Sequence, residues 1–129
     1  MASTLLVDAS LIIDLLRGHA DATAYLAPLL ARRVVVSHPA IISEVLSGAR
    51  DQRHLRSLDA ALAPLPLLRV RSSDFDASLD LLRTYRLSTG IGWADCLIAA
   101  TALRLGVPFV TLNDKHFRPI RGLKVIRPY

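Results

Sequence analysis

Short apolar runs alternate along this chain with longer stretches of helical periodicity, and this alternation constrains the fold most strongly. Three runs have the apolar character of buried strands, at 5–7, 34–36 and 109–112, and 123–126 is a fourth candidate. Helices are expected at 10–18, 20–33 with an interruption at Pro28, 37–48, 51–62, 73–85 and 94–105. Short strands separated by longer helices predict an α/β fold, with a short, mostly parallel central sheet covered by helices on both faces.

Length and composition indicate one folded domain, 1–129. A chain of 129 residues is too short for two ordinary domains, and no polar stretch is long enough for a disordered linker. The apolar runs fall far below the roughly 20 residues that span a bilayer, and no basic region precedes the first of them. The single cysteine, Cys96, cannot form an internal disulfide, which fits a reducing compartment. We therefore expect a cytoplasmic protein with no membrane segment.

The charged residues are unevenly distributed between types. Sixteen Lys and Arg against eleven acids give a net charge of +5; the basic residues are nearly all Arg, and Glu44 is the one Glu. Either a solvated Arg-rich surface or a polyanionic partner explains this balance. Few Glu partners on helix surfaces leave Arg side chains free for phosphate. Candidates that lie near the acidic motifs are Arg17, Arg50, Arg53, Arg118 and Arg121.

Four acidic residues occupy positions at which a catalytic or metal-binding role is expected. Asp8 and Asp114 follow the strands at 5–7 and 109–112, and the carboxyl ends of parallel strands are where α/β sites form. Glu44 has apolar neighbours on both sides, so we expect its helix to be largely buried and its carboxylate to need a partner. Asp95 is the one acid in 94–105 and follows the Gly90-Ile91-Gly92 loop.

Each of these acids also has a structural interpretation. Asp8 and Asp114 stand where helix caps or turns are common. Glu44 would fit a solvent-facing stripe of its helix. Asp95 would interact favourably with the positive N-terminal end of its helix. Ser10 is a candidate for the N-cap of the helix that follows Asp8.

Together, however, the four acids supply carboxylate oxygens, which are suitable ligands for a hard divalent cation. His19, His38, His54 and His116 show no zinc-ligand spacing. Without metal, clustered carboxylates should repel one another and raise at least one pKa.

Four motifs in this order resemble the PIN domain family over essentially the whole chain. They are Val7-Asp8-Ala9-Ser10 with Ile13-Asp14-Leu15-Leu16-Arg17-Gly18, Ile42-Ser43-Glu44-Val45-Leu46-Ser47-Gly48, Asp95-Cys96-Leu97-Ile98-Ala99-Ala100-Thr101-Ala102, and Thr111-Leu112-Asn113-Asp114-Lys115-His116-Phe117. The chain's size also resembles that of VapC toxins of type II toxin–antitoxin pairs.

The resemblance implies a three-layer α/β/α PIN fold and a metal-dependent endoribonuclease that uses Mg²⁺, with Mn²⁺ as a substitute. It implies an RNA substrate, products with 5′-phosphate and 3′-hydroxyl ends, a cognate antitoxin, a homodimer and a toxin–antitoxin hetero-oligomer. Asp8, Glu44 and Asp95 match the family motif. For the fourth acid we choose Asp114, with Asn113 as a substitute ligand or water holder; His116 is a further helper.

Two alternatives remain. A phosphotransfer receiver domain also gathers acids at strand ends and uses a late Lys, as Lys115 would be. Its acceptor Asp should end a middle strand, whereas 34–36 is followed by Ser37. A catalytically inactive PIN-like binding module is the second alternative, in which the acids only cap helices. The presence of Asp8, Glu44 and Asp95 together argues against it.

Overall fold

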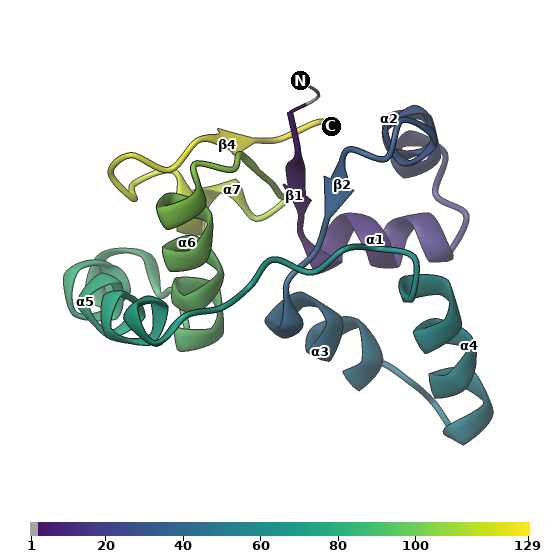
Figure 1. The fold of residues 1–129 in the computed structure, drawn as a ribbon, viewed down its shortest axis with the longest axis horizontal. Coiled ribbons are helices and arrows are strands. Elements are labelled where there is room, and N and C mark those ends of the chain that lie inside the picture. The colour runs from purple at the N-terminus through teal and green to yellow at the C-terminus, as the bar shows by residue number, and fades with distance from the viewer. Residues whose placement is uncertain (1–2) are drawn as a thin grey trace.

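The computed structural model describes residues 3–129 and has a central sheet with helices packed around it (Figure 1). In chain order the elements are β1 (Leu5–Val7), α1 (Ala9–Leu16), α2 (Ala20–Ala31), β2 (Val35–Val36), α3 (Pro39–Ser47), α4 (Gln52–Leu62), α5 (Ser72–Thr89), α6 (Trp93–Leu105), β3 (Phe109–Val110), α7 (Asp114–Phe117) and β4 (Val125–Ile126). The predicted α/β class is confirmed.

The sheet is parallel throughout its four strands, in the order β2-β1-β3-β4. Leu6 of the inner strand β1 pairs with Val36 on one side and Phe109 on the other. Because the strands are parallel, their carboxyl ends meet at one edge. The residues that directly follow β1, β2 and β3 are Asp8, Ser37 and Thr111, so three polar side chains begin at this edge.

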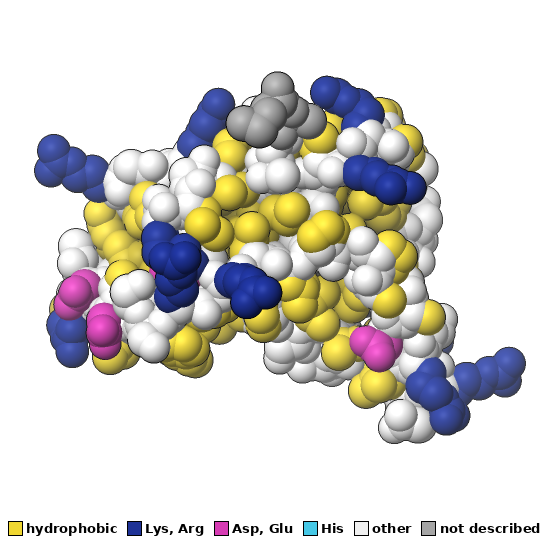
Figure 2. Space-filling view, viewed as in Figure 1, with side chains coloured by type: hydrophobic (Ala, Val, Ile, Leu, Met, Phe, Trp, Pro, Cys, Tyr) yellow, Lys and Arg dark blue, Asp and Glu magenta, His cyan; other side chains and the backbone are white. Residues whose placement is uncertain are grey.

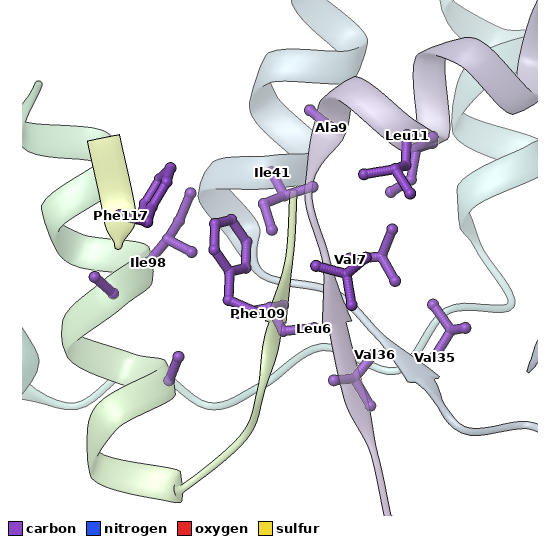
Figure 3. Close-up of a cluster of buried hydrophobic side chains, with 14 of the residues drawn as sticks. Leu6, Val7, Ala9, Leu11, Val35, Val36, Ile41, Ile98, Phe109 and Phe117 are labelled. Atoms are coloured by element: carbon purple, nitrogen blue, oxygen red, sulfur yellow. The ribbon is translucent and has the colours of Figure 1, made fainter. Parts of the chain in front are cut away.

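Apolar side chains fill the space between the sheet and its helices (Figure 3). Phe109 lies beside Ile98 of α6 and Phe117 of α7, and Leu11 of α1 lies near Val7. All five are buried at 1% exposure or less. The rings of Phe109 and Phe117 meet edge to face, with centroids 4.6 Å apart. These contacts hold α1, α6 and α7 against the strands, and therefore fix the elements that surround the polar edge.

Three local predictions were wrong in detail. Helix α1 begins at Ala9 because Asp8 caps it, so Ser10 is not the cap. Helix α2 runs through Pro28 without interruption; the carbonyl of Pro28 still accepts from the backbone N–H of Arg32. Helix α5 continues to Thr89 and ends only at Gly90, which adopts a left-handed conformation with φ 77°. Glycine takes this conformation at little steric cost, so Gly90 allows the chain to turn at the end of α5.

Within residues 3–129, each helix is too short or too polar to cross a membrane.

Shortening Phe117 should destabilise the fold strongly. Phe117→Ala removes a fully buried ring that packs on Phe109, and such truncations cost about 3–5 kcal/mol of unfolding free energy. Phe75→Ala, in which the lost ring is 46% exposed, is the matched control and should cost much less. Urea denaturation of both variants measures the difference, and equal losses would contradict this description of the core.

Candidate active site

Asp8 is the carboxylate that the fold holds most tightly. It follows β1 directly, and its backbone N–H donates to the carbonyl of Val110 at 2.8 Å. Its Oδ1 accepts from the backbone N–H of Ala9 at 2.8 Å, which caps α1, and its Oδ2 accepts from the hydroxyl of Thr111 at 2.7 Å. The residue is only 6% exposed. A buried carboxylate with a donor on each oxygen has a fixed orientation.

Thr111 is a part of the site that the sequence reasoning missed. It follows β3 as Asp8 follows β1, and it is fully buried. Its hydroxyl accepts from the backbone N–H of Asn113 at 3.0 Å, which directs the hydroxyl hydrogen to Asp8. The signal that identifies it is its place immediately after a strand adjacent to β1, which requires knowledge of the strand order.

Glu44 and Asp95 both line a depression between α3 and α6. This depression has a volume of about 230 Å³, and its lining includes both carboxylic residues with the small residues Ala40, Ser43, Gly92 and Ala94. Asp95 lies in the first turn of α6 and is half-buried. The expectation that the helix of Glu44 is largely buried was wrong: α3 buries Ile41 and Val45, whereas Glu44 is exposed as a whole residue.

The three carboxylates influence one another electrostatically. Burial first, and then the negative charges of Asp8 and Glu44, raise the pKa of Asp95 to about 6. Partial burial of its carboxylate and repulsion from Asp8 raise the pKa of Glu44. Burial also raises the pKa of Asp8, although the hydrogen bonds from Thr111 and Ala9 act in the opposite direction. Raised pKa values at three neighbouring acids mark a site that lacks compensating positive charge.

The donor set fits a hard divalent cation that keeps part of its water shell. All three side chains offer carboxylate oxygens, which Mg²⁺ prefers. In the part of the chain that the structure describes, however, no group of three or more His, Cys, Asp or Glu side chains lies close enough together to hold a metal ion. Mg²⁺ commonly binds through one or two carboxylates, with water and substrate phosphate as the other ligands.

Asp114 is not joined to this group. It begins the short helix α7, and its two carboxylate oxygens accept from Arg118 at 2.8 Å and from Arg127 at 3.1 Å. The hydrogen bonds from Arg118 and Arg127 lower the pKa of Asp114. The amide of Asn113 lies 2.9 Å from Nδ1 of His116. The structure therefore unites Asp8, Glu44 and Asp95, and a ligand role for Asp114 or Asn113 stays a prediction.

The PIN domain family model matches residues 5–123 of this sequence. The chain belongs to the PIN domain family. Among curated PIN relatives, Ribonuclease VapC19 of Mycobacterium tuberculosis is 32% identical over 114 residues, which cover 87% of this chain and 90% of the relative. Ribonuclease VapC1 of Rickettsia felis is 26% identical over 130 residues, covering 95% of this chain and 94% of the relative.

Solved structures share the same PIN fold. A chain of a toxin–antitoxin complex from Klebsiella pneumoniae superposes with a TM-score of 0.78 at 24% identity, and the match covers 98% of both chains. A chain of VapBC2 from Rickettsia felis, in a crystal structure bound to a DNA fragment from its promoter, gives a TM-score of 0.76 at 22% identity and covers 95% of this chain and 97% of that one. At these identities, the likeness shows the fold.

The surface of this PIN domain is rich in exposed basic side chains. On the face in Figure 2, Lys and Arg side chains are spread over both halves of the molecule and outnumber the acidic ones. Of the predicted phosphate contacts, Arg118 is paired with Asp114. Within residues 3–129, Arg17, Arg50, Arg53 and Arg121 have no ion-pair partner. The described fold therefore leaves these four guanidinium groups available to a polyanion.

The raised pKa of Asp95 predicts a pH-dependent loss of stability in the metal-free protein. Folding raises this pKa from 3.8 to about 6, so the folded state favours the protonated acid. The free energy of unfolding should therefore fall as the pH rises from about 4 to about 6. After allowance for partial solvent exposure, the fall due to Asp95 is about 1–2 kcal/mol. Asp95→Asn should reduce it.

The measurement is urea denaturation in the presence of a chelator at pH 4 and pH 7. Asp76→Asn on the exposed surface of α5 is the control, and it should keep the wild-type pH dependence. If wild type and Asp95→Asn lose equal stability between the two pH values, Asp95 does not lie in the electrostatic environment described above.

Proposed function

We propose that this PIN protein is a metal-dependent endoribonuclease and the toxin of a type II toxin–antitoxin pair. The observation that carries the proposal is the set of three carboxylates, Asp8, Glu44 and Asp95, whose pKa values are raised by burial and, for Glu44 and Asp95, also by repulsion from the neighbouring carboxylates. A bound cation would offset the negative charge of the carboxylates and reduce the repulsion between them. The names of its VapC relatives as ribonucleases support RNA as the substrate.

Mg²⁺ is the proposed cofactor, and Mn²⁺ would replace it. When bound, a divalent cation supplies positive charge to the phosphoryl oxygens and lowers the pKa of water near the phosphodiester. We assign Asp8 and Asp95 as its primary ligands. Glu44 would complete the set directly or through water, since it is the most exposed of the three. Asp114 would join them only if it left Arg118 and Arg127.

The chain's own residues have separate tasks in this proposal. Thr111 and the backbone N–H of Ala9 hold the Asp8 carboxylate in one orientation, so it needs little reorganisation on binding. Glu44 and Asp95 border the depression in which a scissile phosphodiester would lie. Glu44 is accessible to solvent and is suited to orient the attacking water by a hydrogen bond.

Replacing either primary ligand should abolish Mg²⁺-dependent RNA cleavage. Asp8→Asn and Asp95→Asn keep the side-chain size but remove the negative charge that holds the cation. Cleavage of a labelled RNA, with and without Mg²⁺, measures the effect, and circular dichroism checks the fold. Asp76→Asn, on the exposed surface of α5, is the matched control and should cleave as wild type does.

The outcomes distinguish an active ribonuclease from a catalytically inactive PIN-like binding module. Undiminished cleavage by Asp8→Asn or Asp95→Asn would contradict the mechanism. A wild-type protein that binds the antitoxin yet cleaves no RNA under any metal condition would instead favour the inactive PIN-like binding module. Asp114→Asn tests whether Asp114 is a fourth ligand of the cation. Cleavage by this variant at the wild-type rate would show that it is not.

An antitoxin is the proposed protein partner. The solved neighbours from Klebsiella pneumoniae and Rickettsia felis are toxin–antitoxin assemblies, which supports a hetero-oligomer for this chain. A groove of about 500 Å³ between α1, α3 and α4 is the surface we assign to it. Its apolar lining includes Ile13, Leu16, Val45 and Leu58, and Arg17, Arg50 and His54 add basic character. An apolar segment with acidic flanks would complement it. The homodimer stays a prediction.

A charge placed in this groove should weaken antitoxin binding. Leu16 is 41% exposed, so Leu16→Glu introduces a carboxylate into the groove with little effect on the core. If the antitoxin is encoded immediately upstream, as we expect of such a pair, co-expression with it and pull-down should recover less partner for Leu16→Glu than for wild type. Leu87→Glu, at a fully exposed leucine on α5, is the matched control. Equal recovery with all three proteins would place the partner elsewhere.

A further inference from the structure

A chain of buried polar side chains joins α3, α5 and α6. His38 and Thr101 are fully buried, and Asp74 is 2% exposed. Nε2 of His38 lies 3.1 Å from the hydroxyl oxygen of Thr101, which lies 3.1 Å from Oδ2 of Asp74. Burying three polar side chains is costly unless each is hydrogen-bonded, and here each of them is.

The direction of these hydrogen bonds follows from the start of α3. The backbone N–H of Ala40 donates to Nδ1 of His38 at 3.0 Å, so Nδ1 carries no hydrogen. Nε2 therefore carries the hydrogen of the neutral ring and donates it to Thr101. Burial lowers the pKa of His38 to about 4, which keeps the ring neutral. The Thr101 hydroxyl then donates toward Asp74, and the carbonyl of Leu97 is a second acceptor at 3.0 Å.

Asp74 anchors the far end of the chain. Its carboxylate accepts from Nε of Arg104 at 2.7 Å and from the terminal nitrogen of the same guanidinium at 3.0 Å. It also accepts from the backbone N–H of Arg71, and Arg104 donates to the carbonyl of Arg69. These bonds hold the network on the segment that leads into α5, so its position does not depend on apolar packing alone.

The network connects the two helices that border the depression. His38 caps α3 six residues before Glu44, and Thr101 lies on α6 six residues after Asp95. Six helical residues span about 9 Å, so a small rotation at the His38–Thr101 contact moves the carboxylates appreciably. The hydrophobic effect is non-directional, whereas a satisfied buried hydrogen bond specifies one relative position of the two helices. The His38–Thr101 hydrogen bond therefore joins the two helices that carry Glu44 and Asp95.

We propose that His38, Thr101 and Asp74 form a positioning network that sets the separation of Glu44 and Asp95, and through it the affinity of the site for a divalent cation. This inference rests on the proposed function, because it assumes that these carboxylates bind the cation. The three residues do not touch the cation in this proposal. They act through the relative placement of α3 and α6.

The test measures Mn²⁺ binding to the metal-free protein by calorimetry, with no RNA present. Thr101→Val keeps the shape but removes the hydroxyl, and it should weaken Mn²⁺ binding about tenfold, as loss of a residue that orients a ligand does. Thr101→Ser keeps the hydroxyl and should restore affinity. In RNA cleavage, Thr101→Val should lower kcat with little change in KM. Thr84→Val is the control, because the Thr84 hydroxyl only bonds within α5.

A second variant covers the case in which Thr101→Val does not fold. His38→Asn keeps a side-chain acceptor for the start of α3 but is too short to reach Thr101. It should weaken Mn²⁺ binding to a similar extent, and combining it with Thr101→Val should add little, since both changes break the same contact. Thermal melting of each variant records its stability separately.

Three results would each have a different meaning. If Thr101→Val melts earlier but binds Mn²⁺ as tightly as wild type, the network is merely structural and the inference is overturned. If wild type binds Mn²⁺ but cleaves no RNA, the ribonuclease proposal fails while the network's effect on affinity still stands. If wild type binds no Mn²⁺, both proposals are overturned.

Discussion

The hydrogen bond from Thr111 to Asp8 is the interaction on which the site most directly depends. It joins the carboxyl ends of β1 and β3, which are adjacent only because the sheet has the order β2-β1-β3-β4. It also reduces the cost of burying Asp8, which the same fold needs as the cap of α1. The Asp8 side chain therefore both caps α1 and provides a carboxylate at the edge of the sheet.

The remaining carboxylates are stabilised less directly. Glu44 and Asp95 lie on two helices that border the depression, and burial together with repulsion between carboxylates raises the pKa of each. His38 and Thr101 join the same two helices by a buried hydrogen bond. The arrangement combines a cluster of carboxylates with raised pKa values and a buried hydrogen-bonded contact between the helices that carry two of them.

Much of the fold was predictable from particular residues, because apolar runs and helical periodicity are local signals. The strands near 5–7, 34–36 and 109–112 were found, although the second and third are shorter than expected. Asp8, Glu44 and Asp95 were predicted as site residues, and the structure brings them together. The reasoning for Glu44 was nevertheless wrong in part, since its helix is exposed on that side. Apolar neighbours in sequence do not reveal which face of a short helix meets the sheet.

The sequence by itself determined the α/β class, the place of Asp8 after a strand and the oxygen-donor chemistry of the acids, because these depend on residue type and local order. Only the tertiary structure decided that Thr111 holds Asp8, that His38 reaches Thr101, and that Asp114 pairs with Arg118 and Arg127. The physical reason is that hydrogen bonds and ion pairs act over a few ångströms. Residues 63 or 103 positions apart satisfy that condition only after the strands and helices have packed.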